Sequence, residues 1–197
     1  MLLALALCRL SAQNVTITGK TNKPNSMVRL LTYNDLLTFE TSEAQRTKSD
    51  SNGCFTLQTT IDNVSLVQIA VDLERVEVLL SPNASYNLEI TIPEQDEGAS
   101  YFERKMPVLK VNSASDGGLY DKFSMSEQIV NDFIAENFNR IYRNRQISLI
   151  DSIDVIIKRY VGDINSNFIN GYIQYKKASL TLAAKKYRDA GFTAENM

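Results

Sequence analysis

The stretch SDSNGCFTL, residues 49–57, joins a polar turn to the start of an alternating segment. The tripeptide Ser-Asn-Gly at 51–53 has the composition of a tight turn, because asparagine and glycine accept the positive φ that such turns require. Phe55 and Leu57 then alternate with polar residues, so both fall on one face of a strand. The stretch predicts a β-hairpin corner, with Gly53 as the turn residue and Phe55 and Leu57 in the core.

Two other interpretations of this stretch fail on spacing. Asp50, Asn52 and Gly53 resemble the beginning of a calcium loop, but such a loop needs a bidentate carboxylate at its twelfth position. Ile61 occupies that position. Cys54 has no second cysteine within two residues, so the C-x-x-C motif of thiol–disulfide chemistry is absent. A packing role is therefore expected for Cys54, and no metal or cofactor site is expected here.

The composition excludes several classes of function. The chain has 197 residues, of which 44% are hydrophobic and 22% charged, as in globular proteins. Its net charge of −2, with lysine and arginine spread along the chain, argues against nucleic-acid binding. Histidine is absent, which excludes Ser-His-Asp and Cys-His catalysis and histidine-containing zinc sites. Tryptophan is also absent, so carbohydrate is a weakly supported partner, although tyrosines partly substitute as stacking platforms.

Residues 1–13, MLLALALCRLSAQ, predict a secretion signal peptide. The apolar run at 2–7 precedes Ser-Ala-Gln at 11–13, whose small residues suit a cleavage site. The usual basic segment is missing, so the signal is expected to begin upstream of this sequence; a buried N-terminal strand or helix is the alternative. No later run approaches the roughly 18 apolar residues of a membrane span. We expect a periplasmic or secreted protein of the cell envelope, with Cys54 as its one remaining cysteine after cleavage.

Residues 14–93 have the period-two pattern of half-buried strands and predict an antiparallel β-sandwich of about seven strands. The pattern is clearest in SYNLEITI, 85–92, where every second residue is apolar. The segments at 64–71 and 76–80 are more continuously apolar, as expected for strands buried on both faces. Further strands are expected at 15–18, 27–33, 36–39 and 54–58.

The pattern changes to period 3.6 after a polar stretch that contains PEQDEG and SASDGG. Ser124 and Glu127 have capping-box spacing at the start of a first helix. A second helix is expected to end near Gly162, and a third to end at Gly191 in a left-handed cap. The fold class is therefore α+β, a β-sandwich followed by a three-helix region. The expected divisions are a signal peptide (1–13), a β-sandwich (14–93), a linker (94–118), a helical region (119–191) and the start of a possible further element (192–197).

The three expected helices expose more apolar surface than they can bury among themselves, which indicates a protein partner. Tyr172 and Tyr175 lie three residues apart and form a possible interface, although aromatic residues at helical spacing more often pack internally. Asp151 and Asp154 form an acidic pair of the kind used in glycoside hydrolysis. They lie on the polar face of the second expected helix, where solvation is the default, so no catalytic residue is assigned.

Four segments together resemble a known family: VTITGK (15–20), VRLLTY (28–33), TKSDSNGCFTL (47–57) and SPNASYNLEITI (81–92). They are similar to transthyretin-like, carboxypeptidase-regulatory-type β-sandwiches, as in the N-terminal region of Bacteroidota cell-envelope proteins that often continue into a thioredoxin-like thiol–disulfide oxidoreductase. The resemblance implies Gly53 at the turn, Phe55 and Leu57 in the core, and an extracytoplasmic location. It transfers no catalytic residue, because the 197 residues contain no C-x-x-C.

The function expected from these observations is that of a non-catalytic binding or scaffolding module of the bacterial cell envelope. It would contact protein, either a downstream domain or another envelope component, through its apolar helical faces. The alternative is an N-terminal accessory region of a periplasmic thioredoxin-like oxidoreductase whose catalytic domain lies beyond Met197.

Overall fold

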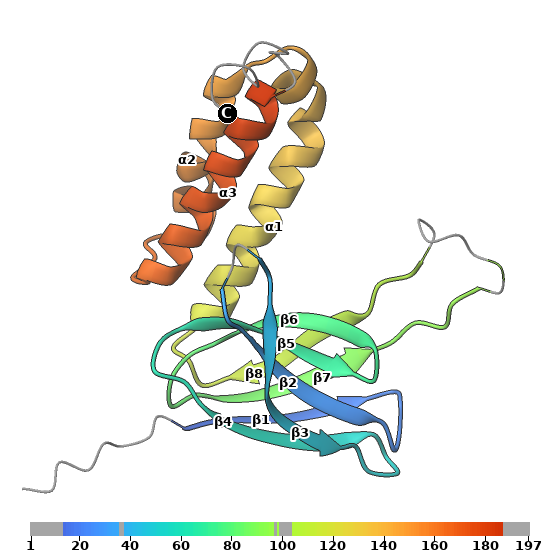
Figure 1. Cartoon of the computed structure of the whole chain (residues 1–197). Helices are drawn as coiled ribbons and strands as arrows, with labels where there is room; N and C mark the ends of the chain where they lie inside the picture. The colour runs from blue at the N-terminus through green and yellow to red at the C-terminus, as the bar shows by residue number, and fades with distance from the viewer. Residues whose placement is uncertain (1–13, 36–37, 97, 99–103, 187–197) are drawn as a thin grey trace, which may run out of the picture. The chain divides into compact units, whose positions relative to one another are not determined.

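The computed structural model describes residues 14–35, 38–96, 98 and 104–186. The chain divides after Gly117 into two compact units, one built of strands and one of helices (Figure 1). The predicted α+β class, a β-sandwich followed by helices, is confirmed. Each unit is described by itself below.

The β unit contains two four-stranded sheets that lie face to face (Figure 1). The strand order is β4-β1-β7-β8 in one sheet and β3-β2-β5-β6 in the other. Neighbouring strands are antiparallel except β1 and β7, which are parallel. The strands are β1 (Asn14–Thr21), β2 (Met27–Tyr33), β3 (Thr41–Lys48), β4 (Cys54–Thr60), β5 (Ser65–Val71), β6 (Glu74–Leu80), β7 (Ser85–Thr91) and β8 (Val108–Ala114).

The core of the β unit follows the hydrophobic pattern of the sequence. In β7, Tyr86, Leu88 and Ile90 are buried and the residues between them are exposed, as the alternation predicts. In β5, Leu66, Val67 and Ile69 to Val71 are all buried, as expected for a continuously apolar strand. The hydrophobic pattern predicts the core because the apolar face of a strand is removed from water when it packs against the other sheet.

Strand β3 was not expected from the sequence. Its residues, TSEAQRTK, are polar and mostly exposed or half-buried. It is an edge strand that pairs only with β2 within its sheet, so it has no buried face to produce an alternating pattern. The short strand expected at 36–39 is different: residues 36–37 lie outside the described residues, and Thr38 and Phe39 are not in a strand.

Strand β8 corrects the expected linker of residues 94–118. Residues 108–114 form an edge strand that pairs with β7 in antiparallel register, from Thr91 opposite Val108 to Tyr86 opposite Ala114. Pro107 stands directly before the strand and does not interrupt it. The strand was hidden because its side chains are only exposed or half-buried.

The helical unit has three α-helices that run alongside one another (Figure 1). They are α1 (Leu119–Phe138), α2 (Ser152–Tyr160) and α3 (Asn167–Lys186). Between α1 and α2 the chain makes a π-helical turn, η2 (Asn139–Arg143), and a 3₁₀ turn, η3 (Ile147–Asp151). The buried side chains come from all these segments: Phe123, Val130, Phe133, Ile141, Ile150, Ile153, Ile157, Ile169, Ile173, Leu180 and Ala184.

The helix boundaries correct one expectation and agree with another. Helix α1 begins after Gly117 and Gly118, which both have positive φ, so Ser124 lies inside the helix and forms no capping box. Helix α2 ends just before Gly162, which has a φ of 78°. Gly191 and residues 192–197 lie outside the described residues, as does the expected signal peptide of residues 1–13.

Candidate functional site

The turn at residues 49–53 joins β3 to β4, which lie in different sheets, so it connects the two sheets and is not the expected β-hairpin corner. The turn is held by its own hydrogen bonds. Asp50 Oδ1 accepts hydrogen bonds from the backbone N–H groups of Asn52 and Cys54, both at 2.8 Å. The buried hydroxyl of Ser49 donates to the carbonyl of Lys23 at 3.0 Å and accepts from the N–H of Ser26 at 3.0 Å. These bonds tie the turn to the neighbouring β1–β2 connection and give it a structural role.

Gly53 occupies a position that no other residue fits. Its φ is 79°, and a Cβ built on it would lie 1.9 Å from the carbonyl oxygen of Thr21. The Gly53 carbonyl accepts a hydrogen bond from the Thr21 N–H at 2.9 Å. The glycine therefore allows the turn to approach the backbone of β1 closely.

Cys54, Phe55 and Leu57, which follow Gly53 in β4, have different environments. Phe55 and Leu57 are buried in the sandwich. A Cβ at Gly19, opposite Phe55 in β1, would lie 2.3 Å from Phe55 Cζ, so the ring fills the space beside that glycine. Cys54 is exposed and forms no disulfide, so the packing role expected for it is wrong.

Two tyrosines of the β unit have raised pKa values. Burial raises the pKa of Tyr86 to about 12, and its hydroxyl accepts a hydrogen bond from the Ser81 N–H at 2.8 Å. Burial and then the hydrogen bond to Glu77 raise the pKa of Tyr33 to about 12. Gln68 Nε2 also donates to the Tyr33 hydroxyl, at 2.5 Å. Both phenols stay protonated at neutral pH. Tyr33 links β2 to β5 and β6, and Tyr86 links β7 to the turn that follows β6.

The structure gives different environments to the two tyrosines expected at an interface. Tyr172 is half-buried: its hydroxyl donates to Glu127 Oε1 at 2.7 Å, and its ring centroid lies 5.2 Å from that of Phe123. Lys176 Nζ lies 5.1 Å from the Tyr172 ring centroid. Tyr175, in contrast, is 52% exposed. Of the pair, Tyr175 is the one available to a partner.

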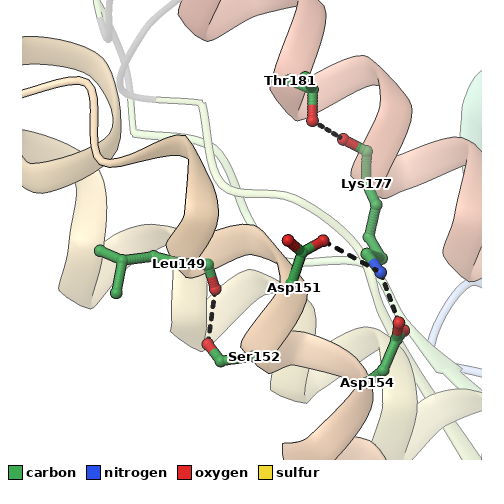
Figure 2. A network of polar contacts seen from close by, with 6 residues as sticks. All are labelled: Leu149, Asp151, Ser152, Asp154, Lys177 and Thr181. Carbon is green, nitrogen blue, oxygen red and sulfur yellow. Dashed lines mark hydrogen bonds and ion pairs between the residues drawn. The ribbon is translucent and has the colours of Figure 1, made fainter.

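The acidic pair of α2 and its preceding turn is bound to a lysine of α3. Figure 2 shows Lys177 Nζ between Asp154 Oδ2, at 2.5 Å, and Asp151 Oδ1, at 4.0 Å. The Lys177 side chain is only 12% exposed, whereas that of Asp151 is 85% exposed. The contact joins α3 to the start of α2. Asp154 is therefore an ion-pair partner, and the two carboxylates do not form a free acid–base pair.

A polar pocket of about 480 Å³ lies beside this ion pair in the helical unit. Asp154 contributes to its wall, and isoleucines supply its apolar part. Its lining residues are Asp154, Ile157, Lys158, Gly162, Asp163, Ile164, Asn165, Asn170, Ile173 and Gln174. The amide and charged side chains that line this pocket do not together indicate one class of ligand.

A second pocket has a more distinctive lining. We call it the Phe138 pocket: it is lined by Phe138, Tyr142, Arg143, Arg145 and Ala183 and has a volume of about 770 Å³. The rings of Phe138 and Tyr142 lie 4.7 Å apart with an interplanar angle of 41°. The sequence did not lead us to predict a binding site at these residues. The available signal was the arginine-rich run FNRIYRNRQ at 138–146, which contains no acidic residue.

Comparison with known proteins does not identify the chain: no protein-family model matches it, and no curated protein matches it. Within the described ranges, no helix is both long and apolar enough to cross a membrane. The same residues contain no cluster of three or more His, Cys, Asp or Glu side chains arranged to hold a metal ion.

Proposed function

We propose that this protein is a non-catalytic binding or scaffolding module that contacts another protein through its helical unit. The observation that carries the proposal is the set of large apolar side chains exposed on that unit, each between 49% and 66% exposed. They are Met125, Phe138, Val155, Tyr160, Tyr175 and Leu182. Exposed apolar side chains on a small helical bundle favour association with a partner, because burying them removes apolar surface from water.

The hydrogen bonds and ion pairs of the carboxylate and phenol side chains support a non-catalytic role. Asp50 is engaged by the turn that it closes, and Asp154 by Lys177. Tyr33 is hydrogen-bonded to Glu77 and keeps its proton at neutral pH. A general acid or base needs free access to a substrate and a pKa near the working pH. These side chains lack that combination.

We also propose that the protein acts outside the cytoplasm, in the bacterial cell envelope. The support is the apolar run followed by Ser-Ala-Gln at the N-terminus, together with the resemblance of the β unit to envelope-protein sandwiches. N-terminal sequencing of the natural protein from the periplasmic fraction tests this. A mature chain beginning after residue 13 is expected, and an intact N-terminus in the cytoplasmic fraction would contradict the proposal.

Site-specific photo-cross-linking in cells that produce the protein tests the binding role. A photoreactive residue in place of Tyr175 should give a discrete adduct with one protein partner, because that side chain is 52% exposed. The matched control places the same residue at Thr56, an exposed position of β4. Equal adduct patterns from both positions, or no adduct from Tyr175, would refute a specific helical interface.

The second candidate function, an accessory region of a thioredoxin-like oxidoreductase, rests on the same exposed helical side chains and on the family resemblance. If the protein is such an accessory region, the domain that covers these helical side chains belongs to the same polypeptide. The two candidates differ in the intact mass of the natural protein. A mass well above the 22.2 kDa of these 197 residues, with a C-x-x-C in the added sequence, favours the accessory region.

A further inference from the structure

The Phe138 pocket forms where the helical unit departs from α-helical geometry. At the end of α1 the N–H of Asn144 donates to the carbonyl of Asn139 at 2.9 Å, which is the i to i+5 bond of a π-helical turn. The next bond, from the Gln146 N–H to the Arg140 carbonyl, is also 2.9 Å long. Single π-helical turns are rare and frequently occur at functional sites.

Arg145 adds a second irregularity in the same segment. Its φ of 60° places a non-glycine residue in the left-handed region. Such a conformation costs on the order of 1 kcal/mol or more and persists where the surrounding structure enforces it. The fully buried Ile141 and the buried Ile150 anchor the chain on either side of Arg145. The arginine-bearing segment is therefore held in one shape before any ligand arrives.

The charge of this segment indicates an anionic ligand. Residues 139–146 contain Arg140, Arg143 and Arg145 and no acidic residue, although the whole chain has a net charge of −2. Arg140 donates to Asn137 Oδ1 and Gln146 Oε1, at 3.0 and 3.1 Å. Arg143 and Arg145 are exposed, and neither forms an ion pair with any residue that the structure describes. Guanidinium groups in this situation are well suited to bind carboxylates.

The other wall of the pocket is apolar. Phe138 is 51% exposed, and its ring packs against that of Tyr142 at a centroid distance of 4.7 Å. Ala183 of α3 leaves room beside the rings, and the pocket volume of about 770 Å³ lies in the range of ligand-binding sites. A ligand that uses the whole pocket must therefore carry both an apolar group and negative charge.

We propose that the Phe138 pocket binds an acidic segment of a partner protein, with its carboxylates on Arg143 and Arg145 and an apolar side chain against Phe138 and Tyr142. This inference rests on the proposed binding function and names the chemistry of its partner. A protein segment is favoured over an anionic membrane because the site is a concave pocket on an acidic protein, whereas membrane surfaces attract broad clusters of basic residues.

Fluorescence anisotropy with a defined probe tests the proposal. The probe is a short labelled peptide in which glutamate alternates with leucine and phenylalanine, and the protein is the full chain. Binding should weaken about fivefold or more in the double variant Arg143→Gln/Arg145→Gln, because each exposed charge pair contributes up to a few-fold in affinity. Phe138→Ala should also weaken binding, through the lost apolar contact.

The controls separate charge from apolar contact and from non-specific effects. Arg159→Gln removes one positive charge from an exposed position of α2 outside the pocket and should leave affinity within about twofold. A peptide with glutamine in place of glutamate should bind as weakly to the original protein as the acidic peptide binds to the double variant. Equal binding of the two peptides overturns the proposal, as does equal binding by the double variant. Arginine-dependent binding to anionic vesicles without peptide binding overturns it in favour of a membrane.

The failure of this inference can be told apart from the failure of the proposed function. Tyr175 does not line the Phe138 pocket, so its cross-linked adduct reports a protein partner independently of the arginines. A Tyr175 adduct without arginine-dependent peptide binding overturns only the role of the pocket. The absence of both the Tyr175 adduct and peptide binding with the original arginines in place overturns both proposals.

Discussion

Replacing Gly53 with alanine tests the proposed role of the turn directly. Alanine would have to keep a φ of 79°, which costs about 1–2 kcal/mol for a residue with a Cβ. Its Cβ would also lie 1.9 Å from the Thr21 carbonyl oxygen, a backbone atom of β1, so the turn must move. That movement weakens the 2.9 Å hydrogen bond from Thr21 to Gly53, whose loss costs about 0.5–1.5 kcal/mol. The expected destabilisation of the β unit is about 1.5–3.5 kcal/mol.

Hydrogen exchange followed by mass spectrometry measures this change for each unit separately. Core amides of β1 and β4 should exchange about 10-fold to 300-fold faster, since each 1.4 kcal/mol corresponds to a factor of ten. Amides of α1 to α3 serve as an internal reference and are expected to change less, because Gly53 belongs to the β unit.

Gly117→Ala is the matched control for backbone strain alone. Gly117 has a φ of 70°, but a Cβ there would meet no atom within 4 Å. It should therefore cost only about 1–2 kcal/mol. Equal effects of the two substitutions would refute the argument that close approach to Thr21 is what requires Gly53.

Three further predictions follow from individual side chains. The stability contributed by Tyr86 is present below pH 10 and is lost as the pH rises through its folded pKa of about 12. Urea denaturation at a series of alkaline pH values should show that Tyr86→Phe loses less stability than the original protein, by on the order of 1–2 kcal/mol once solvent screening is allowed for. Lys177→Ala should destabilise the helical unit by about 1–2 kcal/mol in chemical denaturation, through the lost ion pair to Asp154 and lost packing of the lysine stem, whereas a small effect would show that the contact is only superficial. In a Cys8→Ser background, Ellman's reagent should modify Cys54 as quickly in the folded protein as in urea, and marked protection would contradict its exposure.

The parts of the fold that the sequence predicted are those with one buried face. Strand β7 and the three helices were predicted because the interior requires apolar residues at their spacing. Strands β3 and β8 were missed because both are sheet edges whose side chains remain at least partly in water. Edge strands are defined by backbone pairing with a neighbour, and backbone pairing leaves little trace in side-chain hydrophobicity.

The start of α1 was misplaced for a related reason. Ser124 and Glu127 have the spacing of a capping box, but spacing alone does not say whether the serine precedes the helix or lies within it. The glycine pair at 117–118, both with positive φ, sets the boundary earlier: the N-cap is Gly118, six residues before Ser124. Glu127 is instead used across the helical unit, where it accepts the hydrogen bond from Tyr172.

The Phe138 pocket could not have been predicted by periodicity, because it depends on a break in periodicity. An ideal α-helix would continue the 3.6-residue spacing through Phe138 and Ile141. The π-helical turn keeps Ile141 buried while Phe138 remains half exposed beside Tyr142. Residues 139–146 then carry three arginines and no acidic residue, where an ordinary surface helix would carry mixed charges. An irregular backbone, arginines without an ion pair and exposed aromatic rings thus occur together in one segment. Each of these features costs free energy, and binding of an acidic, apolar ligand would offset that cost.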